Sequence, residues 1–163
     1  MMLSYRQTAA VLVAIPAGLL AYAYYLQFAQ GEEPCPLCIT QRICFFLVGL
    51  FALLSMFKYR SRIWQSLSNA LISLSAIVGL IVAGRQLWLQ SLPEDQVPAC
   101  GPGFNYIVQN FPLSEAISIM FRGNGNCAEV GWTFLSLSIA GWAFIFFTLL
   151  LLGALLQISR KVD

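Results

Sequence analysis

The chain has 163 residues, of which 59% are hydrophobic and only 10% are charged. A soluble domain carries about 25% charged residues, so this composition excludes an ordinary soluble protein and indicates a single integral-membrane domain over residues 1–163. The net charge is +2 and no cluster of basic residues forms a nucleic-acid-binding pattern, so we expect the lipid bilayer, and no nucleic acid, as a partner.

The first predicted span covers about residues 8–29, which carry no charge and are long enough to cross a bilayer as a helix. Pro16 and Gly18 lie inside this span, and membrane helices tolerate both residues. Ala21 and Ala23 have the spacing of a signal-peptidase site, but the apolar run continues beyond them. We therefore expect an uncleaved first helix.

A pair of cysteines follows in a short loop at about residues 30–38, in the run Pro34-Cys35-Pro36-Leu37-Cys38-Ile39-Thr40-Gln41-Arg42. Pro36 suits the first position of a helix, which places Cys35 at the N-cap and Cys38 in the first turn, where the helix dipole favours a thiolate. Arg42 follows Cys38 at i+4, and helical side chains lean toward the N-terminus, so its guanidinium would point back at the sulfur. This pattern predicts a redox pair with a cation beside it.

Three other interpretations of these residues stay open on the sequence alone. The CxxC pair is compatible with a purely structural bridge. It is also compatible with half of a zinc site, which Cys100 and Cys127 would have to complete because the chain has no histidine. Arg42 is compatible with a charge that snorkels to a membrane boundary. The redox interpretation, which requires no metal, is the one that the spacing of Arg42 from Cys38 favours.

The second span is predicted at about 39–57, the third at 63–84 and the fourth at 132–158. One short turn and two loops, at about 30–38 and 86–131, connect the spans, so we expect an antiparallel four-helix bundle. The third span contains small residues suited to close helix packing, namely Ser68, Ser73, Ser75 and Gly79. Cys44 lies within the second span, and we expect it to pack as a small hydrophobe.

The placement of lysine and arginine predicts the orientation of the bundle in the membrane. Basic residues fall at Arg6, in the turn with Lys58, Arg60 and Arg62, and in the tail with Arg160 and Lys161, whereas acidic residues including Glu32 and Glu33 fall on the other side. Both termini are therefore predicted to be cytoplasmic. The pairs Cys35/Cys38 and Cys100/Cys127 are predicted on the outer side, where disulfides persist.

The second outer loop contains a short amphipathic pattern. Leu113, Ala116, Ile117, Met120 and Phe121 recur at helical spacing, which predicts a helix that lies on the membrane surface. Glycine and proline surround Cys100 on one side of this helix and glycine and asparagine precede Cys127 on the other, through Pro98, Gly101, Pro102, Gly103 and the run Gly123-Asn124-Gly125-Asn126. These two cysteines are compatible with a static staple of the loop and with a bridge that opens and closes.

Taken together, these residues resemble the disulfide bond formation protein B (DsbB) group of bacterial inner-membrane thiol oxidases. The likeness covers essentially the whole chain. It rests on the Cys35–Arg42 run at the head of the second of four spans, on Cys100, and on the run Gly125-Asn126-Cys127-Ala128-Glu129 leading into Trp132-Thr133-Phe134-Leu135.

The resemblance implies an electron relay in the bacterial inner membrane. A periplasmic dithiol oxidase of the DsbA type would form a mixed disulfide at Cys100, and Cys35–Cys38 would renew the Cys100–Cys127 bridge through a transient bridge between Cys35 and Cys127. Cys38, with Arg42 beside it, would pass the electrons to a membrane quinone, either ubiquinone or menaquinone. A cysteine pair at a bilayer surface, in a chain without a metal or flavin motif, also favours a quinone acceptor.

The expected quinone contacts are Cys38, Gln41 and Arg42 at the head of the second span, together with Arg85, Gln86, Trp88 and Gln90 at the exit of the third. Arg85 and Trp88 are equally compatible with a helix C-terminus and an aromatic belt. Two other functions remain: a reductase that resembles vitamin K epoxide reductases, and a nonenzymatic four-span adaptor with a disulfide-stapled loop. The compact chain and the Cys100/Cys127 pair favour the oxidase, which we expect to be a monomer.

Overall fold

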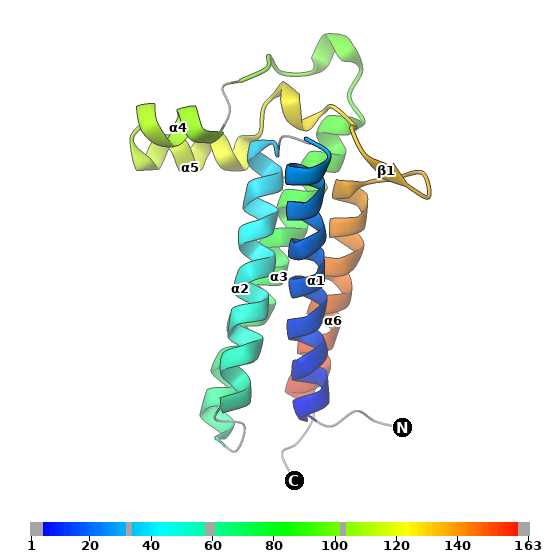
Figure 1. The fold of residues 1–163 in the computed structure, drawn as a ribbon. Helices are drawn as coiled ribbons and strands as arrows, with labels where there is room; N and C mark the ends of the chain where they lie inside the picture. Colours follow the sequence, from blue (N-terminus) through cyan, green and yellow to red (C-terminus); the bar gives the residue numbers. More distant parts are fainter. Residues whose placement is uncertain (1–4, 32–33, 58–60, 102–103, 160–163) are drawn as a thin grey trace.

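Four long helices carry the fold in a computed structural model, which describes residues 5–31, 34–57, 61–101 and 104–159. They are α1 (Tyr5–Ala29), α2 (Pro36–Phe57), α3 (Arg62–Gln90) and α6 (Ile139–Ser159). The helices run side by side in alternating directions (Figure 1), and each is long and apolar enough to cross a membrane. The predicted all-α, four-helix membrane fold is confirmed.

Helices α2, α3 and α6 pack closely at a point where two stacked aromatic rings lie against a glycine. The rings of Phe45 on α2 and Phe147 on α6 stack with centroids 3.9 Å apart and planes 8° from parallel. Gly79 of α3 faces the Phe147 ring so closely that a Cβ atom at this position would collide with it. The absence of a side chain at Gly79 thus allows α3 to pack between α2 and α6, while α1 packs mainly against α2.

The fourth span begins later than the apolar pattern predicts. Residues 133–138 form a hairpin of two short antiparallel strands, β1 (Thr133–Phe134) and β2 (Leu137–Ser138). Leu135 and Ser136 join them with φ angles of 51° and 64°, the left-handed conformation that a two-residue hairpin turn requires and a helix excludes. The helix therefore starts at Ile139 rather than at residue 132.

The described residues of the second outer loop form four short elements: η1 (Glu94–Gln96), α4 (Phe104–Asn110), α5 (Leu113–Arg122) and η2 (Gly125–Cys127). Helix α5 is the predicted amphipathic helix, with Glu115 in its first turn and Arg122 in its last, as the helix dipole favours. Helix α4 was not predicted. Both lie across one end of the bundle (Figure 1), and contact of α5 with a membrane surface stays a prediction.

The first residue of α1 and the last turn of α6 lie together at the opposite end of the bundle (Figure 1). There the Gln157 side-chain amide donates a hydrogen bond to the Tyr5 carbonyl at 3.3 Å. Arg6 and Arg62 start their helices at this end, so the orientation predicted from them is unchanged and stays a prediction. Some residues used in the loop and orientation arguments lie outside the described residues. They are Glu32, Glu33, Lys58, Arg60, Pro102, Gly103, Arg160 and Lys161.

Candidate active site

The CxxC pair lies at the start of α2, as predicted. Because α2 begins at Pro36, Cys35 occupies the N-cap and Cys38 the first turn. The Cys38 backbone N–H donates to Cys35 Sγ at 3.3 Å, so this hydrogen bond of the helix terminus serves Cys35 and not Cys38. The two sulfurs lie 2.9 Å apart, which is longer than a disulfide bond of about 2.05 Å. All five cysteines are free thiols.

Cys127 reaches the same place from the other outer loop. The turn η2 buries it completely against Cys35, in a cluster with Leu37, Val82 and Leu89. Three sulfurs from two loops therefore meet at one end of the bundle, with Cys35 interacting with both Cys38 and Cys127.

Cys100 lies nearby but in a different setting. The Gly125 N–H in η2 donates to the Ala99 carbonyl at 3.2 Å, and a Cβ atom at Gly125 would come 3.0 Å from the Cys100 backbone nitrogen. The backbone that carries Cys100 thus packs directly on the turn that carries Cys127. The Cys100 side chain itself is exposed, so of the two loop cysteines it is the one that a soluble protein can reach.

The contact between Cys35 and Cys127 shifts the pKa values of the two thiols in opposite directions. The Cys35 thiol donates a hydrogen bond to Cys127, which lowers the pKa of Cys127 to about 7 against the opposing effect of burial. The same hydrogen bond raises the pKa of Cys35, and its contact with Cys38 and burial add to this. Cys127 is therefore the more acidic thiol of this contact and Cys35 the less acidic one.

We expect the free energy of unfolding of the fully reduced protein to rise between about pH 7 and pH 9. In this window the unfolded chain binds a proton at Cys127, whose ordinary pKa is 9.0, while the folded chain, with a pKa of about 7, does not. Stability should be lost as the pH falls through 7. Above pH 9 the raised pKa of Cys35 reverses the sign, because only the folded chain keeps that proton.

Thermal unfolding midpoints in a reducing detergent buffer across this pH range measure the effect. Cys127→Ala should weaken the rise, and Cys100→Ala, which changes an exposed thiol in the same pair of loops, should leave it intact. Identical pH profiles for the two variants would contradict the assignment of the lowered pKa to Cys127.

Arg42 is held by α1 and has no hydrogen bond to Cys38. Its guanidinium donates to the side-chain oxygen of Gln27 and, at 3.1 Å, to the backbone carbonyl of Ala23, and it lies 5.2 Å from the centre of the Tyr24 ring. The polar partner of Cys38 is instead Gln86 on α3, whose side-chain nitrogen is 3.3 Å from Cys38 Sγ. The sequence placed Gln86 and Cys38 at the same expected quinone site, but it did not predict this direct contact between residues 48 positions apart.

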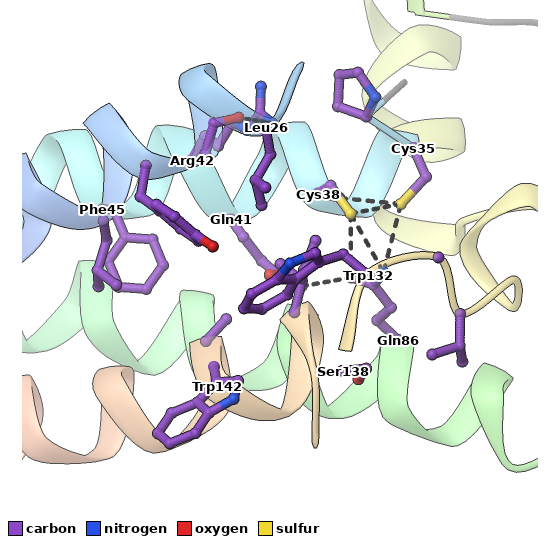
Figure 2. Close-up of a pocket in the computed structure, with 18 of the residues that line it drawn as sticks. Leu26, Cys35, Cys38, Gln41, Arg42, Phe45, Gln86, Trp132, Ser138 and Trp142 are labelled. Carbon is purple, nitrogen blue, oxygen red and sulfur yellow. Dashed lines mark hydrogen bonds between the residues drawn. The ribbon is translucent and has the colours of Figure 1, made fainter. Parts of the chain in front are cut away.

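A cavity of about 350 Å³ opens beside Cys35, Cys38 and Arg42. It lies among all four long helices and the segment that precedes α6, as the close-up in Figure 2 shows. Its wall is mainly apolar and aromatic, and the aromatic residues are Tyr22, Phe45, Trp132, Phe134, Trp142 and Phe146. Polar residues also line it, namely Gln41, Gln86, Gln90, Asn126, Glu129 and Ser138.

The predicted site residues divide into two groups by position. Cys38, Gln41, Arg42, Gln86 and Gln90 line the cavity. Arg85 and Trp88 do not. Their side chains stack on each other, with 4.3 Å between the guanidinium carbon and the ring centre, and Arg85 donates to the Arg122 carbonyl at the end of α5. Arg85 thus ties α3 to the outer loop, and Trp88 packs against the Arg85 guanidinium. Cys44 is buried in the core of the bundle, as expected.

Sequence reasoning missed several residues of the cavity. Reasoning from the sequence also missed Gln27, which does not line the cavity but binds Arg42 at its wall; it was available as an amide inside an otherwise uncharged span, a type of residue that is often functional in membranes. Trp132 and Phe134 were treated as the start of the fourth span. They are instead presented by the hairpin, where Trp132 meets Tyr22 of α1 edge to face at 5.6 Å. Within the part of the chain that the structure describes, no group of three or more acidic or cysteine side chains could hold a metal ion.

A four-helix membrane bundle that gathers three cysteine sulfurs at the mouth of an aromatic cavity has the architecture of a membrane thiol–disulfide oxidoreductase. The chain belongs to the DsbB family: the family model described as disulfide bond formation protein DsbB matches residues 5–157.

Curated relatives share this similarity along most of their length. The disulfide bond formation protein B of Saccharophagus degradans is 46% identical over 158 residues, covering 97% of this chain and 95% of the relative. That of Hahella chejuensis is 50% identical over 135 residues, covering 81% and 82%. That of Marinobacter nauticus is 47% identical over 145 residues, covering 89% and 86%. Membership of this family identifies the chain as a disulfide-bond-forming oxidoreductase.

Proposed function

We propose that this protein re-oxidises a DsbA-type dithiol oxidase of the periplasm and passes the electrons through Cys100/Cys127 and Cys35/Cys38 to a membrane quinone, either ubiquinone or menaquinone. The observation that carries the proposal is the meeting of Cys35, Cys38 and Cys127 beside the cavity, while Cys100 is exposed close by. This arrangement has an entry point for a soluble thiol and an exit point toward an apolar electron acceptor.

The relay begins with the Cys100–Cys127 disulfide. A thiolate of the partner attacks Cys100 Sγ, the bond between Cys100 and Cys127 breaks, and the Cys127 thiolate leaves. Cys127 then attacks Cys35 Sγ in the Cys35–Cys38 disulfide and releases Cys38 as a thiolate. The contact between Cys127 and Cys35 supports this step, because exchange requires the attacking sulfur to reach the disulfide.

The second thiol of the partner completes the transfer. It attacks the partner's own sulfur in the mixed disulfide, which gives the partner disulfide and releases Cys100. Cys100 then attacks Cys127 in the Cys35–Cys127 bridge, restores the Cys100–Cys127 disulfide and releases Cys35. Two electrons and two protons have now moved from the partner to the Cys35/Cys38 dithiol.

The cavity fits a quinone in size and chemistry. Its volume of about 350 Å³ falls within the range of about 300–1,000 Å³ typical of small-molecule sites, and aromatic walls with few polar groups suit a lipid-soluble ring. A bound quinone would accept the two electrons and two protons and become a hydroquinone. Cys38, Arg42, Gln86 and Gln41 would hold it, and Arg42 would supply the positive charge, because α1 keeps its guanidinium at the cavity wall.

The proposal places both termini in the cytoplasm and the four outer cysteines in the periplasm of a bacterial inner membrane. Arg6 and Arg62, at the end of the bundle where α1 begins and α6 ends, support this orientation through the positive-inside rule. A periplasmic location also suits the exposed Cys100, because disulfides persist in that compartment.

The direct test uses purified full-length protein, a reduced DsbA-type partner and a short-chain ubiquinone. We expect continuous oxidation of partner thiols, with one quinone reduced for each partner dithiol oxidised. Thiol trapping follows the partner, and ultraviolet absorbance follows the quinone. Without quinone, oxidation should stop after the disulfides already present in the protein have been used.

Two outcomes would contradict the proposal. Electron flow from hydroquinone to the partner disulfide as the favoured direction would indicate a reductase similar to vitamin K epoxide reductases. Four outer cysteines that stay oxidised, with no exchange with any partner, would indicate a stapled adaptor.

A further inference from the structure

The side chain of Gln86 lies against both sulfurs of the CxxC pair. Its nitrogen Nε2 is 3.3 Å from Cys38 Sγ and 3.6 Å from Cys35 Sγ, and dashed lines in Figure 2 mark these contacts. Gln86 is 4% exposed, so its amide has little competition from water. An N–H donor in such surroundings stabilises an anionic sulfur more than a neutral one.

A second buried amide sets the orientation of Gln86. Gln41 on α2 is 3% exposed, and its Nε2 donates to Gln86 Oε1 at 2.8 Å. A glutamine amide has nearly the same shape after a flip that exchanges oxygen and nitrogen, so its partners decide which atom faces a neighbour. Gln86 Oε1 lies farther from Cys38 Sγ, at 3.7 Å. Because Gln41 donates to this oxygen, the NH₂ group of Gln86 is the nearer of its two polar atoms to the sulfurs.

No cation replaces this donor at Cys38 among the contacts of the described residues. The guanidinium of Arg42 is engaged by Gln27 and Ala23 of α1, and the backbone N–H at the helix terminus serves Cys35. When both cysteines are reduced, the Cys35 thiol also donates to Cys38 Sγ at 2.9 Å, but Cys35 carries no S–H while it is bonded to Cys127. The amide of Gln86 is thus the donor to the released sulfur that does not depend on the state of Cys35.

We propose that Gln86 is a catalytic residue that stabilises the Cys38 thiolate by direct N–H donation, and that Gln41 is a positioning residue that fixes the Gln86 amide in the donating orientation. The inference rests on the proposed function in that Cys35 and Cys38 form the redox pair. Stabilisation of the thiolate stabilises the reduced state, so it makes the Cys35–Cys38 disulfide a stronger oxidant.

The test measures the equilibrium between the Cys35–Cys38 pair and a dithiol redox buffer, in full-length protein freed of quinone. Cys100→Ala and Cys127→Ala are present throughout, so that one pair titrates, and a maleimide mass tag counts reduced thiols. Gln86→Leu should make the disulfide about tenfold harder to reduce, because a hydrogen bond to a charged group is lost. A tenfold change corresponds to a potential about 30 mV more negative.

Two further variants separate thiolate stabilisation from packing. Gln86→Glu keeps the shape of the side chain but replaces the donor with an acceptor, so it should shift the equilibrium in the same direction as Gln86→Leu. Gln41→Leu should produce a smaller shift, and it should add nothing in a Gln86→Leu background, because it acts only through Gln86.

The matched control is Gln90→Leu. Gln90 lies one turn beyond Gln86 on the same helix and lines the same cavity, but its side-chain oxygen accepts a hydrogen bond from Ser138 at 2.8 Å. This variant should leave the redox equilibrium unchanged, whatever its effect on turnover.

An unchanged equilibrium in both Gln86 variants, or equal effects of Gln41→Leu with and without Gln86, would overturn the inference. The measurement needs neither quinone nor partner. A protein without quinone turnover in which the Gln86 shift persists would therefore defeat the proposed function and leave the role of Gln86 standing.

Discussion

Replacement of Cys38 by alanine should abolish quinone-linked oxidation of the partner. Cys35 then has no sulfur with which to re-form a disulfide, so electrons that arrive from Cys127 have no exit toward the cavity. We expect a fall in turnover of at least about a thousandfold, as is usual when a nucleophile of a catalytic unit is removed. The measurement is the coupled loss of partner thiols and quinone absorbance.

Cys44→Ala is the matched control. Cys44 lies six residues further along α2 but is buried in the bundle core, away from the cavity lining. Its removal should cost some stability and leave turnover close to that of the unmodified protein. Undiminished turnover in Cys38→Ala would rule out the relay, and equal losses in the two variants would point to damage to α2 in general.

Replacement of Gly79 by alanine should destabilise the bundle by about 2 kcal/mol. The added methyl group would collide with the Phe147 ring, which cannot retreat freely because it stacks on Phe45. Overpacking of a core costs about 1–3 kcal/mol, and a contact this close belongs at the upper end of that range. After subtraction of the gain of about 1 kcal/mol that alanine has over glycine in a helix, about 2 kcal/mol of destabilisation remains. A thermal unfolding midpoint several degrees lower in detergent is the expected result.

Gly84→Ala on the same helix is the control. A Cβ atom there would lie 3.7 Å from the Phe144 ring, an ordinary contact, so stability should be unchanged or slightly higher. Phe147→Leu should recover part of the loss in the Gly79→Ala protein, because it removes the atoms that collide. Equal midpoints for the two alanine variants would show that α3 can shift to accept the methyl group.

Composition and local pattern were sufficient for the four spans, the helix start at Pro36 and the amphipathic helix Leu113–Arg122. Each depends on residues within one helix: a long uncharged run, a proline at a first helical position, or an apolar repeat. The hairpin at residues 133–138 escaped this reasoning. Its apolar residues continue the hydrophobic pattern of α6. The left-handed turn at Leu135 and Ser136 contains neither glycine nor asparagine, the residues that usually indicate such a turn in a sequence.

The sequence by itself determined that this is a four-helix membrane protein with a CxxC pair at a helix mouth, because bilayer thickness and helix geometry act on every short stretch of the chain. Only the tertiary structure decided which groups surround the sulfurs. The i+4 spacing placed Arg42 on the face of Cys38, but the packing of α1 against α2 engages the guanidinium with Gln27 and Ala23. The packing of α3 brings Gln86 to Cys38 instead. The rotation of each helix about its axis depends on the packing of all four, and no stretch of sequence within one helix records it.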